Sequence, residues 1–258
     1  ESMLYYYRFG AFEISPQMQE MPFRIRFSWR GCHVLPLTLM SARMIFGPEE
    51  MARKVQDDGI VAIVRGDFPA QKVLEIGDAL LAAPVLVMEV TLNTPGALEL
   101  IQMLRARFGQ NMCIGAGTVR TEDQFDAAVD AGAQFTVAPG LNPAVVEQAR
   151  KAGVLHIPGI YTATEAETAH AAGSRLLKLF PANLGGPAYL KALRAPLDDI
   201  RFVPTGGIGP ENAAAWAAAG AAALGVGSSL VTGPDQTMAD LIEQARALRQ
   251  AWESGRSS

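Results

Sequence analysis

From residue 48 onward, short apolar runs alternate with longer amphipathic, alanine-rich stretches, and this alternation constrains the fold more than any other feature. Runs that are apolar on both faces and separated by helices are typical of a parallel sheet covered on both sides. Eight such units predict an α/β protein whose parallel, eight-stranded sheet closes into a (β/α)8, or TIM, barrel. We expect strands at Ile60–Val64, Val85–Val90, Met112–Gly115, Gln134–Ala138, Val154–Pro158, Arg175–Phe180, Ile200–Pro204 and Ala222–Val226. We expect helices over 48–58 and then over about 69–82, 95–108, 121–131, 143–152, 163–172, 187–194, 210–219 and 235–253.

An open, doubly wound sheet is the alternative arrangement of the same units. Such a sheet often carries G-x-G-x-x-G after its first strand, but this chain reads Val64-Arg65-Gly66-Asp67-Phe68 there. The barrel is therefore favoured. No linker interrupts the series, so we expect residues 47–258 to form one domain.

Residues 1–46 have a different composition. They contain Tyr5, Tyr6 and Tyr7 and several arginines, but no lysine and no aspartate. They do not show the order of charged, apolar and cleavage-site segments that is typical of a signal peptide. We expect this segment to be an N-terminal appendage of unknown role, and the pattern assigns it no chemistry.

The composition excludes several function classes. A net charge of −4 gives no electrostatic reason to bind nucleic acid or an anionic membrane surface. Cys32 and Cys113 form no CxxC pair, and the three histidines form no HExxH, so neither a disulfide framework nor a metal site is expected. No apolar run reaches the ~18 residues of a membrane span. We expect an enzyme of the reducing cytoplasm that uses no metal and no cofactor.

Charged side chains are rare in the predicted strands, and three of them lie at or near strand ends. Arg65 ends the first strand, Glu89 the second, and Lys178 lies near the end of the sixth. The C-terminal ends of barrel strands meet in one mouth, where barrel enzymes have their active sites. A structural ion pair of Glu89 with either Lys178 or Arg65 would also account for these residues. Their convergence favours a functional site instead.

Lys178 stands in the apolar run Leu176-Leu177-Lys178-Leu179-Phe180 and shares a strand face with Leu176 and Phe180. A lysine there either extends its ammonium into water or lies in a closed site. Burial disfavours the charged form, and a neutral amine is a nucleophile that condenses with ketones. The run alone favours the exposed lysine, but the position at the barrel mouth favours a Schiff-base nucleophile.

Glycine-rich turns follow the last two strands, at Thr205-Gly206-Gly207 and Gly225-Val226-Gly227-Ser228. The loops after strands seven and eight form the usual phosphate site of such barrels, where backbone N–H groups approach an anion closely. We therefore expect Gly206, Gly207 and Ser228 to bind a phosphate group.

Six motifs occur in the order of one known family: Glu89-Val90-Thr91-Leu92, Gly115-Ala116-Gly117-Thr118-Val119, Ala138-Pro139-Gly140, Pro158-Gly159, Leu177-Lys178-Leu179-Phe180-Pro181-Ala182 and Pro204-Thr205-Gly206-Gly207-Ile208. Over residues 48–253 the chain resembles the 2-keto-3-deoxy-6-phosphogluconate / 4-hydroxy-2-oxoglutarate aldolases. The resemblance implies a metal-independent class I aldolase on a homotrimeric barrel.

The resemblance also implies roles for individual residues. Lys178 would form the Schiff base with the phosphorylated keto-acid substrate, and Glu89 would be the general acid and base. Arg65 would bind the keto-acid carboxylate. Three further positions, Thr118, Pro139 and Phe180, match those that line the pyruvate end of the site, and Gly206, Gly207 and Ser228 match the phosphate-binding positions.

The substrate itself stays open between the gluconate and galactonate epimers. Asn93 stands where the gluconate branch has arginine, and the stretches 92–95 and 186–193 resemble the 6-phosphogalactonate branch. The products would be pyruvate and glyceraldehyde 3-phosphate, with cleavage of 4-hydroxy-2-oxoglutarate to pyruvate and glyoxylate as a further activity. The alternatives are a phosphosugar isomerase or epimerase on the same barrel, and a non-catalytic barrel that binds a phosphorylated ligand.

Overall fold

The structure, a computed structural model, describes residues 46–257, so the predicted appendage lies outside the described residues except for Phe46. Within that range the alternation expected from the sequence is confirmed. The elements are α1 (Pro48–Asp58), β1 (Ile60–Val64), α2 (Ala70–Ala82), β2 (Val87–Thr91), α3 (Ala97–Phe108), β3 (Cys113–Gly117), α4 (Glu122–Asp130), β4 (Phe135–Val137), α5 (Pro143–Ala152), β5 (Leu155–Ile157), β6 (Gly159–Ile160), α6 (Ala163–Ala171), β7 (Leu177–Leu179), the 3-10 turn η3 (Ala182–Leu184), α7 (Gly186–Arg194), β8 (Phe202–Pro204), α8 (Ala213–Ala218), β9 (Leu224–Val226) and α9 (Met238–Arg256).

The strands form a closed parallel barrel, as predicted. One hydrogen-bonded ladder runs β5-β4-β3-β2-β1-β9 and a second runs β6-β7-β8. Thr205, directly after β8, forms a parallel bridge with Gly225 of β9 and so joins one pair of ladder ends. The other junction is covalent, because β5 and β6 are two parts of the expected fifth strand.

Pro158 separates these two parts. Proline has no N–H to donate, so a regular ladder cannot continue through it. β5 therefore pairs with β4, and β6 pairs with β7. The Pro158 carbonyl still accepts a hydrogen bond from the Lys178 N–H at 2.9 Å. The expected sixth strand, which carries Lys178, is consequently β7.

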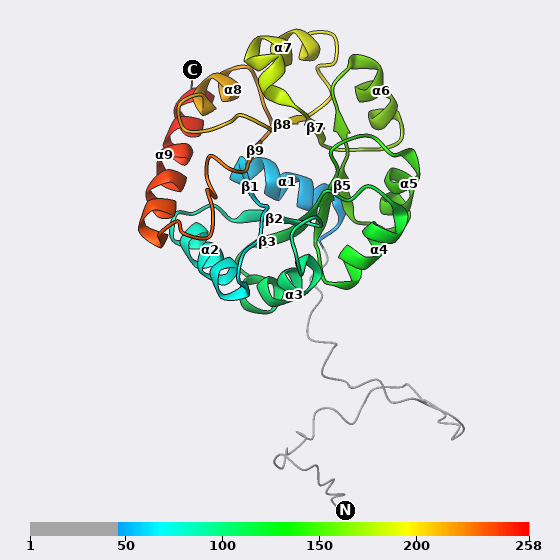
Figure 1. The fold of residues 1–258 in the computed structure, drawn as a ribbon. Helices are drawn as coiled ribbons and strands as arrows, with labels where there is room; N and C mark the ends of the chain where they lie inside the picture. Colours follow the sequence, from blue (N-terminus) through cyan, green and yellow to red (C-terminus); the bar gives the residue numbers. More distant parts are fainter. Residues whose placement is uncertain (1–45, 258) are drawn as a thin grey trace, which may run out of the picture. The chain divides into compact units, whose positions relative to one another are not determined.

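Helices α2 to α9 surround the ring of strands (Figure 1). Four of them begin at a side chain that accepts a hydrogen bond from a backbone N–H in the first turn, which stabilises a helix start. These N-cap residues are Thr121, Asn142, Thr162 and Thr237.

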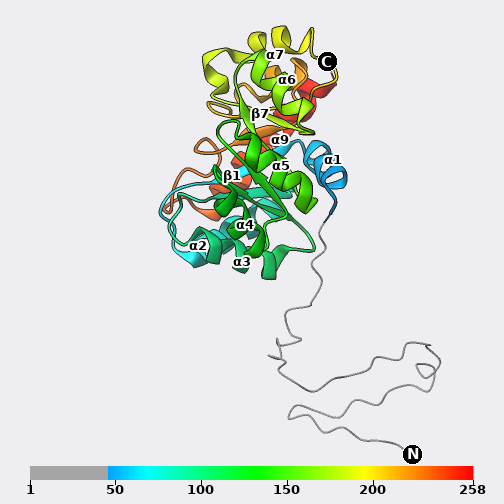
Figure 2. The same cartoon turned by 90° about the vertical axis from the view of Figure 1, so that its right-hand side faces the viewer.

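Helix α1 closes one end of the barrel. It lies across the ring in Figure 1 and at one end of the barrel in Figure 2. Its apolar side chains Met51, Ala52 and Val55 are buried in one cluster with interior residues such as Val87 and Phe135. Because Val87 and Phe135 are the first residues of β2 and β4, α1 covers the N-terminal ends of the strands. The opposite end, where the strands have their C-terminal residues, is not covered by α1.

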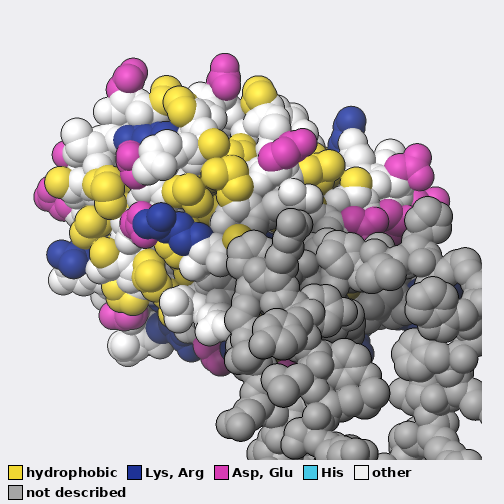
Figure 3. All heavy atoms as spheres, turned by 90° about the horizontal axis from the view of Figure 1, so that it is seen from below, with side chains coloured by type: hydrophobic (Ala, Val, Ile, Leu, Met, Phe, Trp, Pro, Cys, Tyr) yellow, Lys and Arg dark blue, Asp and Glu magenta, His cyan; other side chains and the backbone are white. Residues whose placement is uncertain are grey.

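The outer surface is mixed in character. On the face that Figure 3 shows, acidic and basic side chains are interspersed with hydrophobic ones. Within residues 46–257, none of the helices has the length and apolar character needed to cross a membrane.

Candidate active site

A cavity of about 170 Å³ opens at the C-terminal ends of the strands. Its lining includes all nine residues singled out from the sequence. These are Arg65, Glu89, Thr118, Pro139, Lys178, Phe180, Gly206, Gly207 and Ser228. The C-terminal ends of the barrel strands converge, and residues more than a hundred positions apart in the chain therefore lie in one cavity.

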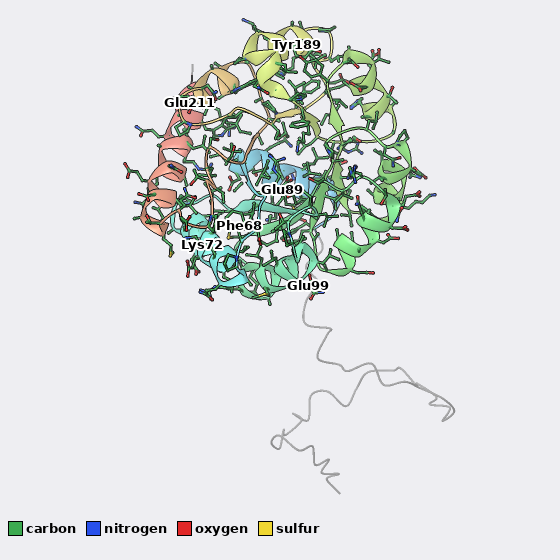
Figure 4. The ribbon with its side chains drawn as sticks, viewed as in Figure 1. Phe68, Lys72, Glu89, Glu99, Tyr189 and Glu211 are labelled. Carbon is green, nitrogen blue, oxygen red and sulfur yellow. The ribbon has the colours of Figure 1, made fainter. Side chains whose placement is uncertain are left out.

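Glu89 and Lys178 form the buried floor of this cavity. Glu89 is 1% exposed and Lys178 is 8% exposed. Figure 4 shows Glu89 inside the ring of strands, whereas Glu99 and Glu211 lie at its periphery. The Oε1 atom of Glu89 has no hydrogen-bond partner among the described residues. Burying a carboxylate oxygen without a hydrogen-bond partner costs folding free energy. Such groups are typical of functional sites.

Burial shifts both groups toward their neutral forms. It raises the pKa of Glu89, and the nearby charges of Lys178 and Arg65 oppose that shift. Burial also lowers the pKa of Lys178; the Glu89 carboxylate opposes this shift and the Arg65 guanidinium adds to it. A lysine with a lowered pKa is a better nucleophile near neutral pH, because more of it is the free amine.

Glycine makes the space for Glu89. A Cβ atom at Gly117 would lie 2.4 Å from Glu89 Oε1, so a larger residue in β3 would displace the carboxylate. The next residue, Thr118, has a φ of 60°. That conformation is strained for a β-branched residue, and such strain is concentrated at functional sites.

The remaining walls differ in polarity. The Lys178 Nζ atom lies 5.2 Å from the centre of the Phe180 ring, and Pro139 adds a second apolar surface. Arg65 is exposed at the rim of the cavity. The site thus combines a buried floor with a cationic edge.

The loop after β8 turns through two consecutive glycines with positive φ angles. Gly206 and Gly207 have φ angles of 104° and 67°. Asn212 donates to the Gly207 carbonyl at 2.8 Å and accepts from the Gly209 N–H at 3.2 Å. The Asn212 side chain therefore fixes the loop from the side.

The loop after β9 is joined to it. The Ser229 hydroxyl donates a hydrogen bond to the Ile208 carbonyl, which connects the two glycine-rich loops. Among the described residues, no group accepts a hydrogen bond from the backbone N–H of Gly207 or Ser228. These N–H groups are therefore available to an anion.

Comparison with known proteins identifies the family. The family model described as KDPG and KHG aldolase matches residues 51–244. The chain belongs to this aldolase family. It is 38% identical to the 2-dehydro-3-deoxy-6-phosphogalactonate aldolase of Escherichia coli K12 over 75% of this chain and 94% of that protein. It is 46% identical to the 2-dehydro-3-deoxy-phosphogluconate aldolase of Treponema pallidum over 54% of this chain and 67% of that protein.

A solved structure supports the same conclusion. The KDPG aldolase of Legionella pneumophila, with pyruvate captured as a covalent carbinolamine intermediate, superimposes with a TM-score of 0.65 at 29% identity. The match covers 77% of this chain and 93% of the Legionella protein. The predicted class is therefore confirmed: the chain is a class I, Schiff-base aldolase that cleaves 2-keto-3-deoxy-6-phospho sugar acids to pyruvate.

Several residues that line this cavity of about 170 Å³ were not singled out from the sequence. Thr91 and Thr205 both line it and are 2% and 6% exposed. Thr91 lies two residues after Glu89 on the same strand face, and this spacing was a usable signal. Asn93, by contrast, is exposed and does not line the cavity.

A larger cavity of about 500 Å³ lies near the opposite end of the barrel. Two of its charged lining residues are paired with each other: Asp58 binds Arg249 at 2.8 Å, and Asp58 also accepts a hydrogen bond from the Leu86 N–H at 2.7 Å. None of the nine residues singled out from the sequence lines this larger cavity. The smaller cavity contains all nine of them, including the buried Glu89, whose Oε1 atom has no hydrogen-bond partner among the described residues.

Proposed function

We propose that Lys178 is the Schiff-base residue and that Glu89 transfers the protons of the aldol cleavage. The Lys178 amine adds to the C2 ketone, and loss of water from the carbinolamine gives a protonated imine. Glu89 takes the proton of the C4 hydroxyl as the C3–C4 bond breaks. The electron pair of that bond moves toward the imine and forms an enamine, and the aldehyde leaves. Glu89 returns the proton to C3, and water hydrolyses the imine to release pyruvate.

One observation carries this proposal: a buried amine and a buried carboxyl share one cavity floor, both with pKa values shifted toward the neutral form. A neutral amine is needed for attack on the ketone. A carboxyl that both accepts and returns a proton works best when its pKa lies near the operating pH. Burial shifts the pKa values of both groups in the directions that these two conditions require.

The other lining residues are proposed to bind and orient the substrate. Arg65 would hold the carboxylate of the keto acid, because a guanidinium binds a carboxylate in a bidentate manner. Thr118, Pro139 and Phe180 would enclose the pyruvate portion. A phosphate on the loops of Gly206, Gly207 and Ser228 would supply remote binding energy that places C3 and C4 beside the reacting groups.

The decisive experiment for the substrate is a pyruvate-release assay with three compounds. The gluconate and galactonate 6-phospho epimers and 4-hydroxy-2-oxoglutarate are compared at equal concentration. We expect the phosphorylated compounds to have a higher kcat/KM than the hydroxy-oxoglutarate, because only they use the glycine-rich loops. Equal values for all three would contradict the phosphate role of Gly206, Gly207 and Ser228.

The pH dependence of imine formation should respond oppositely to two substitutions. The Glu89 charge raises the pKa of Lys178, whereas the Arg65 charge lowers it. Imine formation requires the free amine, so its rate falls as pH drops below that pKa. Glu89→Gln should therefore move the acid limb to lower pH, and Arg65→Gln should move it to higher pH. The measurement is the rate of cyanoborohydride trapping at saturating pyruvate, and shifts in the same direction would contradict the electrostatic assignment.

Assembly, domain division and location belong to the same proposal. We propose a homotrimer, which light scattering of the purified protein measures directly. The barrel domain would span 47–258, with 1–46 as the appendage. Cys113 is a buried free thiol, in keeping with a reducing cytoplasm as the place of action.

A further inference from the structure

The direction in which the Arg65 guanidinium points depends on the backbone of the loop after β1. Its side chain is exposed, and among the described residues no hydrogen bond or ion pair holds its guanidinium. Yet its charge acts on both Glu89 and Lys178. Long, unpaired side chains lose much rotamer freedom on binding a ligand. The orientation of the loop after β1 therefore decides how well Arg65 meets a substrate carboxylate.

Two buried hydroxyl groups hold this loop on both sides of Arg65. The Gly66 N–H donates to Thr94 Oγ1 at 3.4 Å, and Thr91 Oγ1 donates to the Val64 carbonyl at 3.4 Å. The two hydroxyl oxygens lie 3.2 Å apart. Since Thr91 donates its proton to Val64, Thr94 must donate to Thr91. The direction of every hydrogen bond in the chain from Gly66 to Val64 is then fixed.

The threonine pair belongs to the segment that follows Glu89. Thr91 ends β2, and Thr94 lies in the turn after it, where the Thr94 N–H donates to the Thr91 carbonyl at 2.8 Å. Thr91 and Thr94 are 2% and 3% exposed. The pair therefore links the backbone beside Arg65 to the strand that carries Glu89. Thr94 itself does not line the cavity.

We propose that Thr94 is a positioning residue for substrate binding: with Thr91, its hydroxyl fastens the residues on either side of Arg65 and so aims the guanidinium at the carboxylate of the bound keto acid. The inference rests on the proposed carboxylate role of Arg65. Without the Thr94 hydroxyl, the Gly66 N–H and the Thr91 oxygen both lose their partner. The loop then adopts other orientations, and Arg65 binds the carboxylate less often.

The test compares pyruvate binding in Thr94→Val, which keeps the shape but removes the hydroxyl. We expect the half-saturating pyruvate concentration in imine trapping to rise about fivefold to tenfold, the effect of one lost positioned hydrogen bond. The limiting trapping rate should stay within about twofold of the original, because Lys178 is untouched. Thr94→Ser, which restores the hydroxyl, should return the half-saturation value to the original. If the valine variant does not fold, Thr94→Ala removes the same hydroxyl.

Thr136→Val is the matched control. Thr136 is also a fully buried threonine with a hydrogen-bonded hydroxyl, to His156 Nδ1 at 2.8 Å, but it does not line the cavity. This substitution should leave half-saturation by pyruvate unchanged. An equal rise in Thr136→Val would overturn the inference, because the effect would then come from general loosening of the barrel.

A double substitution separates this inference from the proposed function. Arg65→Ala alone should raise the half-saturating pyruvate concentration, and Thr94→Val should add nothing in that background. If Arg65→Ala has no effect, the carboxylate role of Arg65 is wrong. Two outcomes would instead show that the positioning role of Thr94 is wrong while the role of Arg65 stands. In one, Arg65→Ala raises the half-saturating pyruvate concentration but Thr94→Val does not. In the other, Thr94→Val raises it by the same factor whether or not Arg65 is present.

Discussion

Lys178→Met is expected to abolish both turnover and the covalent trapping of pyruvate. Methionine is unbranched and only one atom shorter than lysine but has no amine, so neither carbinolamine nor imine can form. Enzymes accelerate reactions by about 10⁶-fold or more. Without its covalent step this aldolase should lose at least ~10⁴-fold of its kcat. With the unaltered protein, borohydride and pyruvate should leave a three-carbon adduct on Lys178, located by mass spectrometry of the peptides.

The melting temperature of Lys178→Met shows whether the variant loses activity because it unfolds. Lys178 is 8% exposed, and burial lowers its pKa, which means that its charged form is destabilised in the fold. Removing the amine should therefore leave the melting temperature unchanged or higher. Lys191→Met, at an exposed position on α7, is the matched control and should keep full turnover. An adduct that persists in Lys178→Met would place the Schiff base on another residue.

The fold was predictable because each local signal agrees with the barrel. Apolar runs bounded by glycine and proline marked the strands, and β1 coincides with its expected range. The expected strand at Arg175–Phe180 narrows to Leu177–Leu179. Leu176 is buried but lies before the paired residues, so the apolar run is longer than the strand. The sequence did not indicate that Pro158 divides the fifth strand, since proline was also compatible with a strand end.

Helix boundaries were less accurate where side chains bind the backbone. The expected helix over 210–219 begins only at Ala213, because Asn212 binds the Gly206–Gly209 loop instead of continuing the turn. The last helix begins at Met238, after its N-cap Thr237. Neither contact can be derived from periodicity, which reports only the buried face of a helix.

In the candidate site, the charged residues could be predicted from the sequence but the hydroxyl residues could not. Charged residues at strand ends are rare enough in this chain to be noticed, so Lys178, Glu89 and Arg65 could be found from the sequence. Hydroxyl residues are common, and nothing in the sequence distinguishes Thr205 or Thr94 from the rest. The Thr94 contact with Gly66 depends on the pairing of β1 with β2, in which Val64 is opposite Val90. Such contacts across 28 residues require the strand register to be known.

Glu89→Gln is expected to separate imine formation from carbon–carbon bond cleavage. Glutamine has nearly the same shape and fits beside Gly117, but it cannot accept the C4 hydroxyl proton. Loss of a general acid and base costs about 10²- to 10⁴-fold in rate, and kcat should fall by that amount. Trapping of pyruvate on Lys178 should persist, because attack by the amine does not need the carboxylate. The measurements are pyruvate release and borohydride trapping on the same preparation, with Glu99→Gln as the control at an exposed glutamate of α3.

Because imine formation needs no carboxylate but bond cleavage does, turnover at the original rate would remove Glu89 from proton transfer. Loss of trapping together with turnover would instead assign Glu89 to the formation of the imine itself.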